Sequence, residues 1–149
     1  MARPDDDVLR SAGYLLMKAG HHIGADFDAA LTSVGVNGRE LLVLSFVRAA
    51  DGLSQQELSG RLGLDPTIVV GLVDGLEARG LMTRSRHPAD RRRNVLALTD
   101  AGVAAHDSAV AAARRAEDAF LGPLTPRQRT ELATALRAVM APRLGWLEP

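Results

Sequence analysis

The chain has 149 residues, of which 46% are hydrophobic and only 3% aromatic, and its 18 basic and 18 acidic side chains cancel. This length fits one compact domain with its own core, and the abundant Ala, Leu and Val favour helices. The absence of cysteine excludes disulfides, thiolate zinc sites and thiol redox switches. No apolar run reaches the ~20 residues that span a bilayer, and the start MARPDDD is unlike a secretion signal. We therefore expect a cytoplasmic protein with no membrane partner.

The N-terminal part of the chain is predicted to form one long helix and then a shorter one. Apolar residues recur at helical spacing over 7–33: Val8, Ala12, Leu15, Leu16, Ala19, Ile23 and Phe27. Asn37 and Glu40 then form a capping box, which opens a helix that runs to about Ala50.

Two helices joined by a tight turn follow. Ser54 and Glu57 form a second capping box, which opens a short helix over 54–62. Asp65 followed by Pro66 opens another, because proline is favoured at the first helical position, and this helix is expected to stop at Gly80. The spacing matches a helix-turn-helix.

The periodicity changes after Gly80. The segments LMTRSR and NVLALT alternate in character and are separated by the turn-prone HPAD, which predicts a two-stranded hairpin. A long Ala-rich helix is expected from Thr99 to about 121, and a box of Thr125 and Gln128 opens a last helix that reaches about 144. The predicted fold is therefore mainly α with a small β-hairpin wing: a winged helix-turn-helix lobe plus a helical region.

Basic residues concentrate at this hairpin. Between Arg79 and Arg93 lie six of the 18 basic residues and one of the 18 acidic residues. A charge run is usually a solvated face. Here it directly follows a helix-turn-helix, where a wing reaches the DNA backbone and minor groove, so its position favours DNA binding. The predicted wing residues are Arg84, Arg86, Asp90, Arg91, Arg92 and Arg93.

The stretch LVDGLEARGLMTRSRHPADRRRNVLALTDAG resembles the MarR family of bacterial transcriptional regulators. It carries the family's Leu-Val-Asp, Leu-Glu, Arg-Gly-Leu, Asp-Arg-Arg and Leu-Thr-x-x-Gly elements in order. The resemblance implies a homodimer that binds double-stranded DNA at a palindrome and acts as a repressor. It also implies that Asp90 orients Arg92 at the minor groove, with Arg91 and Arg93 as phosphate partners. Asp90 alternatively caps the hairpin turn through its own backbone.

The resemblance also implies how one domain over 1–149 is divided. Residues 7–33 and 122–149 form the helical dimerisation region, 37–98 the winged helix-turn-helix, and 99–121 the long linking helix.

The expected recognition helix has two faces. Val69, Leu72, Val73 and Leu76 form an inward stripe, which leaves Thr67, Val70, Gly71 and Asp74 on the outer side. Since no Arg, Lys, Asn or Gln lies there, bidentate guanine recognition is not expected. The predicted base contacts are Pro66, Thr67, Val70 and Gly71, through thymine methyl groups and close backbone approach. Family members often have arginine where Gly71 and Gly75 stand, which also argues against guanine recognition by this helix. Alternatively, these glycines only loosen the helix.

The start of the short helix is a second predicted DNA contact. Ser54, Gln55 and Gln56 can present backbone N–H groups and side-chain amides to phosphate. The capping box explains Ser54 without DNA, so the two glutamines carry this prediction.

Other function classes find less support. The sequence has no Gly-rich phosphate loop after a strand, no GxSxG and no pair of histidines at zinc-site spacing, so we expect no enzyme, no cofactor and no metal. A winged-helix protein-interaction module that has lost specific DNA binding remains the alternative. Family resemblance implies a small anionic aromatic effector, for which His22, Arg39 and Arg48 are candidate pocket residues. A histidine beside an apolar stripe is more often a packing residue.

Overall fold

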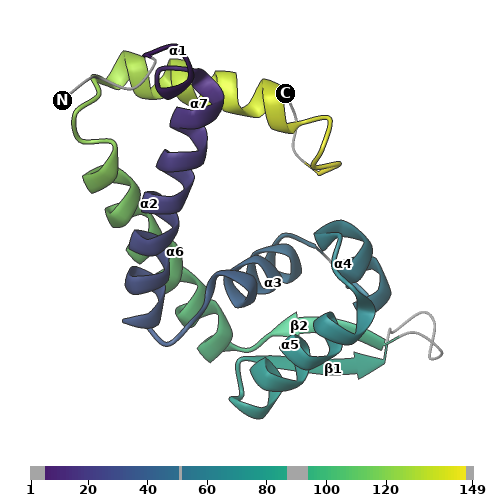
Figure 1. The fold of residues 1–149 in the computed structure, drawn as a ribbon. Helices are drawn as coiled ribbons and strands as arrows, with labels where there is room; N and C mark the ends of the chain where they lie inside the picture. The colour runs from purple at the N-terminus through teal and green to yellow at the C-terminus, as the bar shows by residue number, and fades with distance from the viewer. Residues whose placement is uncertain (1–5, 51, 87–93, 147–149) are drawn as a thin grey trace.

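The computed structural model describes residues 6–50, 52–86 and 94–146. Its elements follow the order α1 (Asp6–Leu9), α2 (Ala12–Thr32), α3 (Gly38–Ala49), α4 (Gln55–Leu62), α5 (Pro66–Ala78), β1 (Met82–Arg86), β2 (Asn94–Leu98), α6 (Asp100–Phe120) and α7 (Pro126–Met140). Figure 1 shows a lobe made of α3, α4, α5 and the hairpin, from which α6 leads to the region of α1, α2 and α7. The predicted class, mainly helical with a winged helix-turn-helix, is confirmed.

Local capping signals explain most of the helix starts. The predicted boxes of Asn37 with Glu40, Ser54 with Glu57, and Thr125 with Gln128 are all formed. In each box the side chain before the helix accepts a backbone N–H bond and the residue three positions on returns one. The three helix starts were therefore predictable from sequence.

Two helix boundaries differ from the sequence prediction. The helix expected over 7–33 is broken, because the Ser11 hydroxyl accepts a bond from the Tyr14 N–H (3.2 Å) and thereby starts α2 afresh. Apolar periodicity continues across this cap, which hides the break. The last helix ends at Met140 instead of about 144, since Pro142 cannot donate the next helical hydrogen bond.

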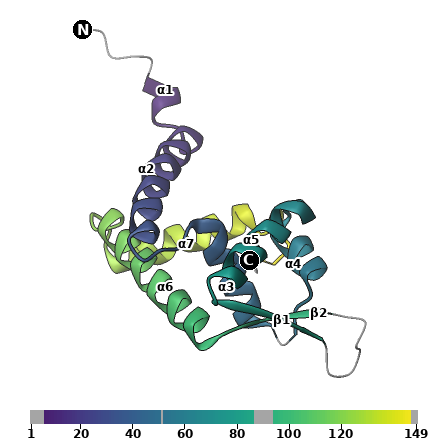
Figure 2. The ribbon, with the colours of Figure 1, turned by 90° about the horizontal axis from the view of Figure 1, so that it is seen from below.

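The hairpin is antiparallel, with Met82 opposite Leu98, Arg84 opposite Leu96 and Arg86 opposite Asn94. The inner strand β2 is also tied to the loop before α4, since the Leu96 N–H donates to the Leu53 carbonyl at 2.9 Å. In Figure 2 the hairpin lies at the edge of the lobe, beside α3. A backbone hydrogen bond thus ties the base of the wing to the loop that leads into α4.

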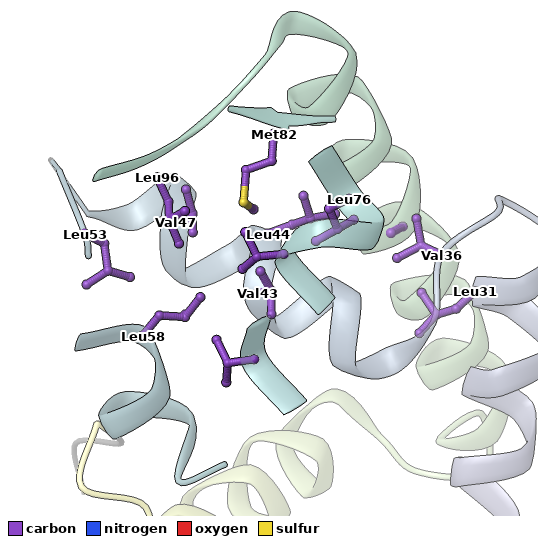
Figure 3. Packing of buried hydrophobic residues seen from close by; sticks show 13 residues of the cluster. Leu31, Val36, Val43, Leu44, Val47, Leu53, Leu58, Leu76, Met82 and Leu96 are labelled. Carbon is purple, nitrogen blue, oxygen red and sulfur yellow. The ribbon is translucent and has the colours of Figure 1, made fainter. Parts of the chain in front are cut away.

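One hydrophobic core holds the lobe together. Figure 3 shows Met82 of β1 pointing toward Leu44 and Leu76, while Leu31 and Val36 extend the cluster to the connection between α2 and α3. Leu44 and Leu76 are fully buried and Met82 is almost so. Full burial of each such side chain is worth roughly 2 kcal/mol, so α3, α5 and β1 are held together chiefly by apolar packing.

The start of α6 packs directly on the end of the α5–β1 connection. The Thr99 hydroxyl donates to the Gly80 carbonyl (2.6 Å) and accepts from the Gly102 N–H (3.0 Å), and the Thr99 N–H donates to the Leu81 carbonyl (3.2 Å). A Cβ added to Gly102 would lie 1.8 Å from the Leu81 oxygen. This contact gives the Leu-Thr-x-x-Gly element a physical reason: threonine caps the helix, and only glycine permits the close approach.

Candidate DNA-binding surface

The helix-turn-helix is formed by α4, a tight turn and α5. Gly63 ends α4 with a left-handed backbone (φ 62°), which favours glycine. The Ser59 hydroxyl then donates to the Leu64 carbonyl (2.7 Å) and fixes the turn. Asp65 accepts a bond from the Thr67 N–H (2.8 Å) and caps α5. The turn therefore presents the N-terminal half of α5 on the outside of the lobe.

The structure confirms which faces of α5 are buried and exposed. Val69, Val73 and Leu76 are fully buried, and Leu72 packs half-buried against the same core. The outward residues are Thr67, Val70, Gly71 and Asp74, all exposed. Their contacts with bases remain a prediction.

The outward face offers methyl groups and backbone. Val70 is 40% exposed, and so is Ile68, which the helical pattern alone does not single out. At about 100° per residue, Val70 lies about 60° from Thr67 and Ile68 about 100° from it on the opposite side. A Cβ added at Gly71 would meet nothing within 4 Å. The backbone at Gly71 is therefore open to close approach from outside.

The residue that caps α4, Ser54, is already engaged by the Glu57 carboxylate. Glu57 accepts bonds from the Ser54 N–H (2.8 Å) and from the Ser54 hydroxyl (2.6 Å). Gln55 is half-buried and Gln56 exposed. Since the hydroxyl of Ser54 is engaged in the capping box, Gln56 is the best placed of the three predicted phosphate contacts.

The predicted wing residues fall into two groups. Asp90, Arg91, Arg92 and Arg93 lie outside the described residues, so their roles remain predictions. Arg86 is exposed at the end of β1. Arg84 is bound within the lobe, where it forms ion pairs with Asp74 and Glu77 of α5.

The three predicted effector-pocket residues lie on two helices. His22 is exposed on α2. Its ring packs edge to face against the ring of His21, with 5.6 Å between the ring centroids. Arg39 is exposed in the first turn of α3. Arg48, near the end of α3, contacts α6 through His106 and Asp107. No described contact joins these three residues, and a shared pocket remains a prediction.

The contact of Arg48 with α6 forms a small polar cluster that the sequence does not predict. His106 Nδ1 lies 2.8 Å from Arg48 Nη1, and its Nε2 lies 3.1 Å from the Ser45 hydroxyl. The hydrogen bond from Arg48 holds the pKa of the Asp107 carboxyl below its ordinary value, since a nearby cation favours the charged form. The partners are about 60 residues apart, and no local pattern signals such a contact.

A second surface of the described chain is apolar. A groove of about 400 Å³ runs between α2 and α7. It is lined by Ala12, Leu15, Leu16, Ala19, Leu132, Ala135, Leu136 and Val139. Leu16 is 43% and Val139 51% exposed. Exposed apolar patches of this kind mark interaction surfaces.

Residues 6–50, 52–86 and 94–146 contain neither a membrane-spanning helix nor a metal cluster. No helix there is long and apolar enough to cross a membrane. No group of three or more His, Asp or Glu side chains there is arranged to hold a metal ion.

Comparisons with known proteins give a consistent result. The model of the MarR family matches residues 36–93. The chain is 29% identical to the HTH-type transcriptional repressor NicR of Pseudomonas putida over 134 residues. These aligned residues cover 90% of this chain and 85% of NicR. It is 31% identical to the transcriptional repressor CouR bound to a 23-mer DNA duplex, with a TM-score of 0.81 and coverage of 93% of this chain and 99% of CouR.

Two ligand-related structures are also similar. CouR from Rhodococcus jostii RHA1 bound to p-coumaroyl-CoA is 30% identical, with a TM-score of 0.74 and coverage of 87% of this chain and 92% of that one. BpsR of Bordetella bronchiseptica, whose DNA binding is regulated by 6-hydroxynicotinic acid, is 27% identical, with a TM-score of 0.74 and coverage of 88% and 94%.

Proposed function

The chain belongs to the MarR family of transcriptional regulators, and we propose that it represses transcription as a homodimer bound to a palindromic operator. The observation that carries this proposal is the exposed outer face of α5, held beside a hairpin that leads into the arginines of residues 91–93. Its place of action is the bacterial cytoplasm, where the DNA lies. We propose no enzymatic activity, since the sequence lacks the catalytic motifs considered above.

The operator can be identified by selection in vitro. The pure homodimer is incubated with a random duplex pool, and the retained DNA is sequenced after several rounds. We expect an inverted repeat whose half-sites lie about one helical turn apart, because two lobes of one dimer bind successive major grooves. Recovery of unrelated sequences would support the alternative, a winged-helix module that binds protein partners.

Effector release is the second part of the proposal. CouR binds p-coumaroyl-CoA and BpsR responds to 6-hydroxynicotinic acid, so an aromatic acid or its thioester is the class of effector to test. His22, Arg39 and Arg48 are our candidates for its pocket. Addition of such compounds to the complex with the selected operator, followed by fluorescence anisotropy, measures release directly.

We assign dimerisation to α1, α2 and α7, which leaves 37–98 as the DNA-binding lobe and α6 as the link. The supporting observation is the apolar groove between α2 and α7, since a second copy of this chain would cover it. Stable dimers of this kind bury apolar side chains that the isolated protomer exposes.

This assignment predicts that a charge in the groove separates the protomers. Leu16→Asp or Val139→Asp should give monomers at micromolar concentration, because a carboxylate buried in an apolar interface has no partner. Sedimentation equilibrium measures the mass. Ile68→Asp is the matched control, since Ile68 is similarly exposed but lies on α5, and it should remain dimeric. Dimers of both groove variants would contradict the assignment.

The recognition helix predicts a requirement for thymine methyl groups. Replacing thymine by deoxyuridine removes only the C5 methyl, so it should weaken binding about fourfold at each position that Thr67 or Val70 contacts. Val70→Ala should abolish part of this sensitivity, whereas Ile68→Ala, on the side away from the wing, should retain it. Equal affinity for thymine and deoxyuridine operators would exclude methyl recognition.

A further inference from the structure

Arg84 lies on the core-facing side of its strand. Side chains alternate along a strand, so Arg84 shares a side with Met82, which is almost fully buried. Its cross-strand partner Leu96 is also buried. The Arg84 side chain is only 28% exposed. The stem of this arginine therefore lies over the edge of the core, below α5.

Two carboxylates of the recognition helix hold the Arg84 guanidinium. Nη1 donates to Glu77 Oε2 at 2.7 Å, and Nη2 donates to Asp74 Oδ1. The second oxygen of Glu77 accepts the backbone N–H of Arg84 at 3.3 Å. Asp74 and Glu77 are three residues apart and so lie on one face of the helix. One side chain of β1 is thus linked to two positions of α5 that lie about one helical turn apart.

The remaining guanidinium nitrogen supports this inward placement. Arg84 Nε is buried and has no hydrogen-bond partner among the described residues. A side chain directed at DNA would expose this donor, whereas the Nε of Arg84 is buried.

Charge supplies a second reason for the contact. Asp74 lies on the outward face of α5 with Thr67 and Gly71, where a lone carboxylate would repel DNA phosphates. The paired Arg84 offsets this negative charge beside the surface that faces DNA.

We propose that Arg84 is a positioning residue, which fixes the angle between the recognition helix and the wing through Asp74 and Glu77. This inference rests on the proposed DNA-binding function and differs from a direct phosphate contact by Arg84. It implies that the two DNA-contacting parts of one lobe act as a rigid unit, so that major-groove and wing contacts form together.

The direction in which Glu77→Gln changes DNA affinity distinguishes a positioning role of Arg84 from a purely electrostatic effect. Glu77→Gln removes a negative charge next to the DNA-binding face, so electrostatics alone predicts tighter binding. The positioning role predicts about tenfold weaker binding to the selected operator, the equivalent of one coupled contact within an ion-pair network. Glu131→Gln is the control, because it breaks an ion pair with Arg127 on α7, away from the lobe, and should bind like the wild type.

Substitutions of Arg84 complete the test. Anisotropy titrations of the full-length dimer at several salt concentrations should show Arg84→Met about tenfold weaker on the operator. The slope of log affinity against log salt should change by much less than about one unit per lobe, because no phosphate contact is lost. Arg84→Lys keeps the charge but loses the two-pronged geometry, so it should rescue only part of the loss. The double variant Arg84→Met with Glu77→Gln should bind no worse than either single variant.

The results distinguish a failure of the positioning role from a failure of the proposed DNA binding. A Glu77→Gln variant that binds as tightly as the wild type, or an Arg84→Met variant whose salt slope falls by about one unit per lobe, would overturn the positioning role and leave DNA binding intact. A wild-type protein that binds no duplex would overturn the proposed function, and the positioning role with it. Circular dichroism of each variant identifies any loss that comes from unfolding.

Discussion

Replacing Gly102 by alanine should lower the free energy of unfolding by about 3 kcal/mol, the upper part of the range for overpacking. The added Cβ would lie 1.8 Å from the Leu81 oxygen, which is backbone and cannot turn away as a side chain would. To relieve the clash, α6 must move off the α5–β1 connection, and the bonds of Thr99 to Gly80 and Leu81 would then weaken. Urea unfolding at a fixed protomer concentration measures the loss.

Gly75→Ala is the matched control for this substitution. Gly75 also lies inside a helix, but a Cβ added there meets nothing within 4 Å. Because alanine has the higher helix propensity, this variant should be more stable than the wild type by about 1 kcal/mol. The two glycine-to-alanine substitutions should therefore change the free energy of unfolding in opposite directions. Equal stability of Gly102→Ala and the wild type would mean that the approach of α6 to Leu81 is loose in solution.

Local rules predict much of this fold because the signals act over three or four residues. The box of Ser54 and Glu57 and the proline at Pro66 fix helix starts by hydrogen bonds and backbone geometry that neighbouring residues supply. The inward stripe of α5 follows from helical spacing alone. These features do not depend on the rest of the molecule.

Contacts between distant elements were not predictable in the same way. Strand alternation places Arg84 on the side of Met82, but only the tertiary structure shows that Asp74 and Glu77 are there to bind it. The close approach of Gly102 to Leu81 depends on how α6 leaves the hairpin. Likewise the contact of Arg48 with His106 joins helices that are far apart in the chain. In each case the sequence shows the residue type but not its partner.

Replacing the wing arginines by alanine should affect DNA binding in two different ways, one for Arg91 and Arg93 and another for Arg92. If Arg91 and Arg93 contact phosphates, each substitution should weaken operator and nonspecific DNA alike. Each should also reduce the slope of log affinity against log salt by about one unit per lobe, because fewer counterions are released. Titrations of the dimer at several salt concentrations give both quantities. These residues lie outside the described part of the chain, so the prediction rests on their sequence and on the strands that they connect.

Arg92→Ala should show a different signature. If Arg92 enters the minor groove, the lost interaction depends on groove width, so the loss should be larger on an A·T-rich operator flank than on a G·C substitute. Asp90→Ala should resemble a mild form of Arg92→Ala, since it frees the guanidinium without removing it. If Arg92→Ala instead binds both duplexes like the wild type, the wing does not enter the minor groove. The concentration of arginine at the hairpin would then serve another partner, and the protein-interaction alternative would gain its first direct support.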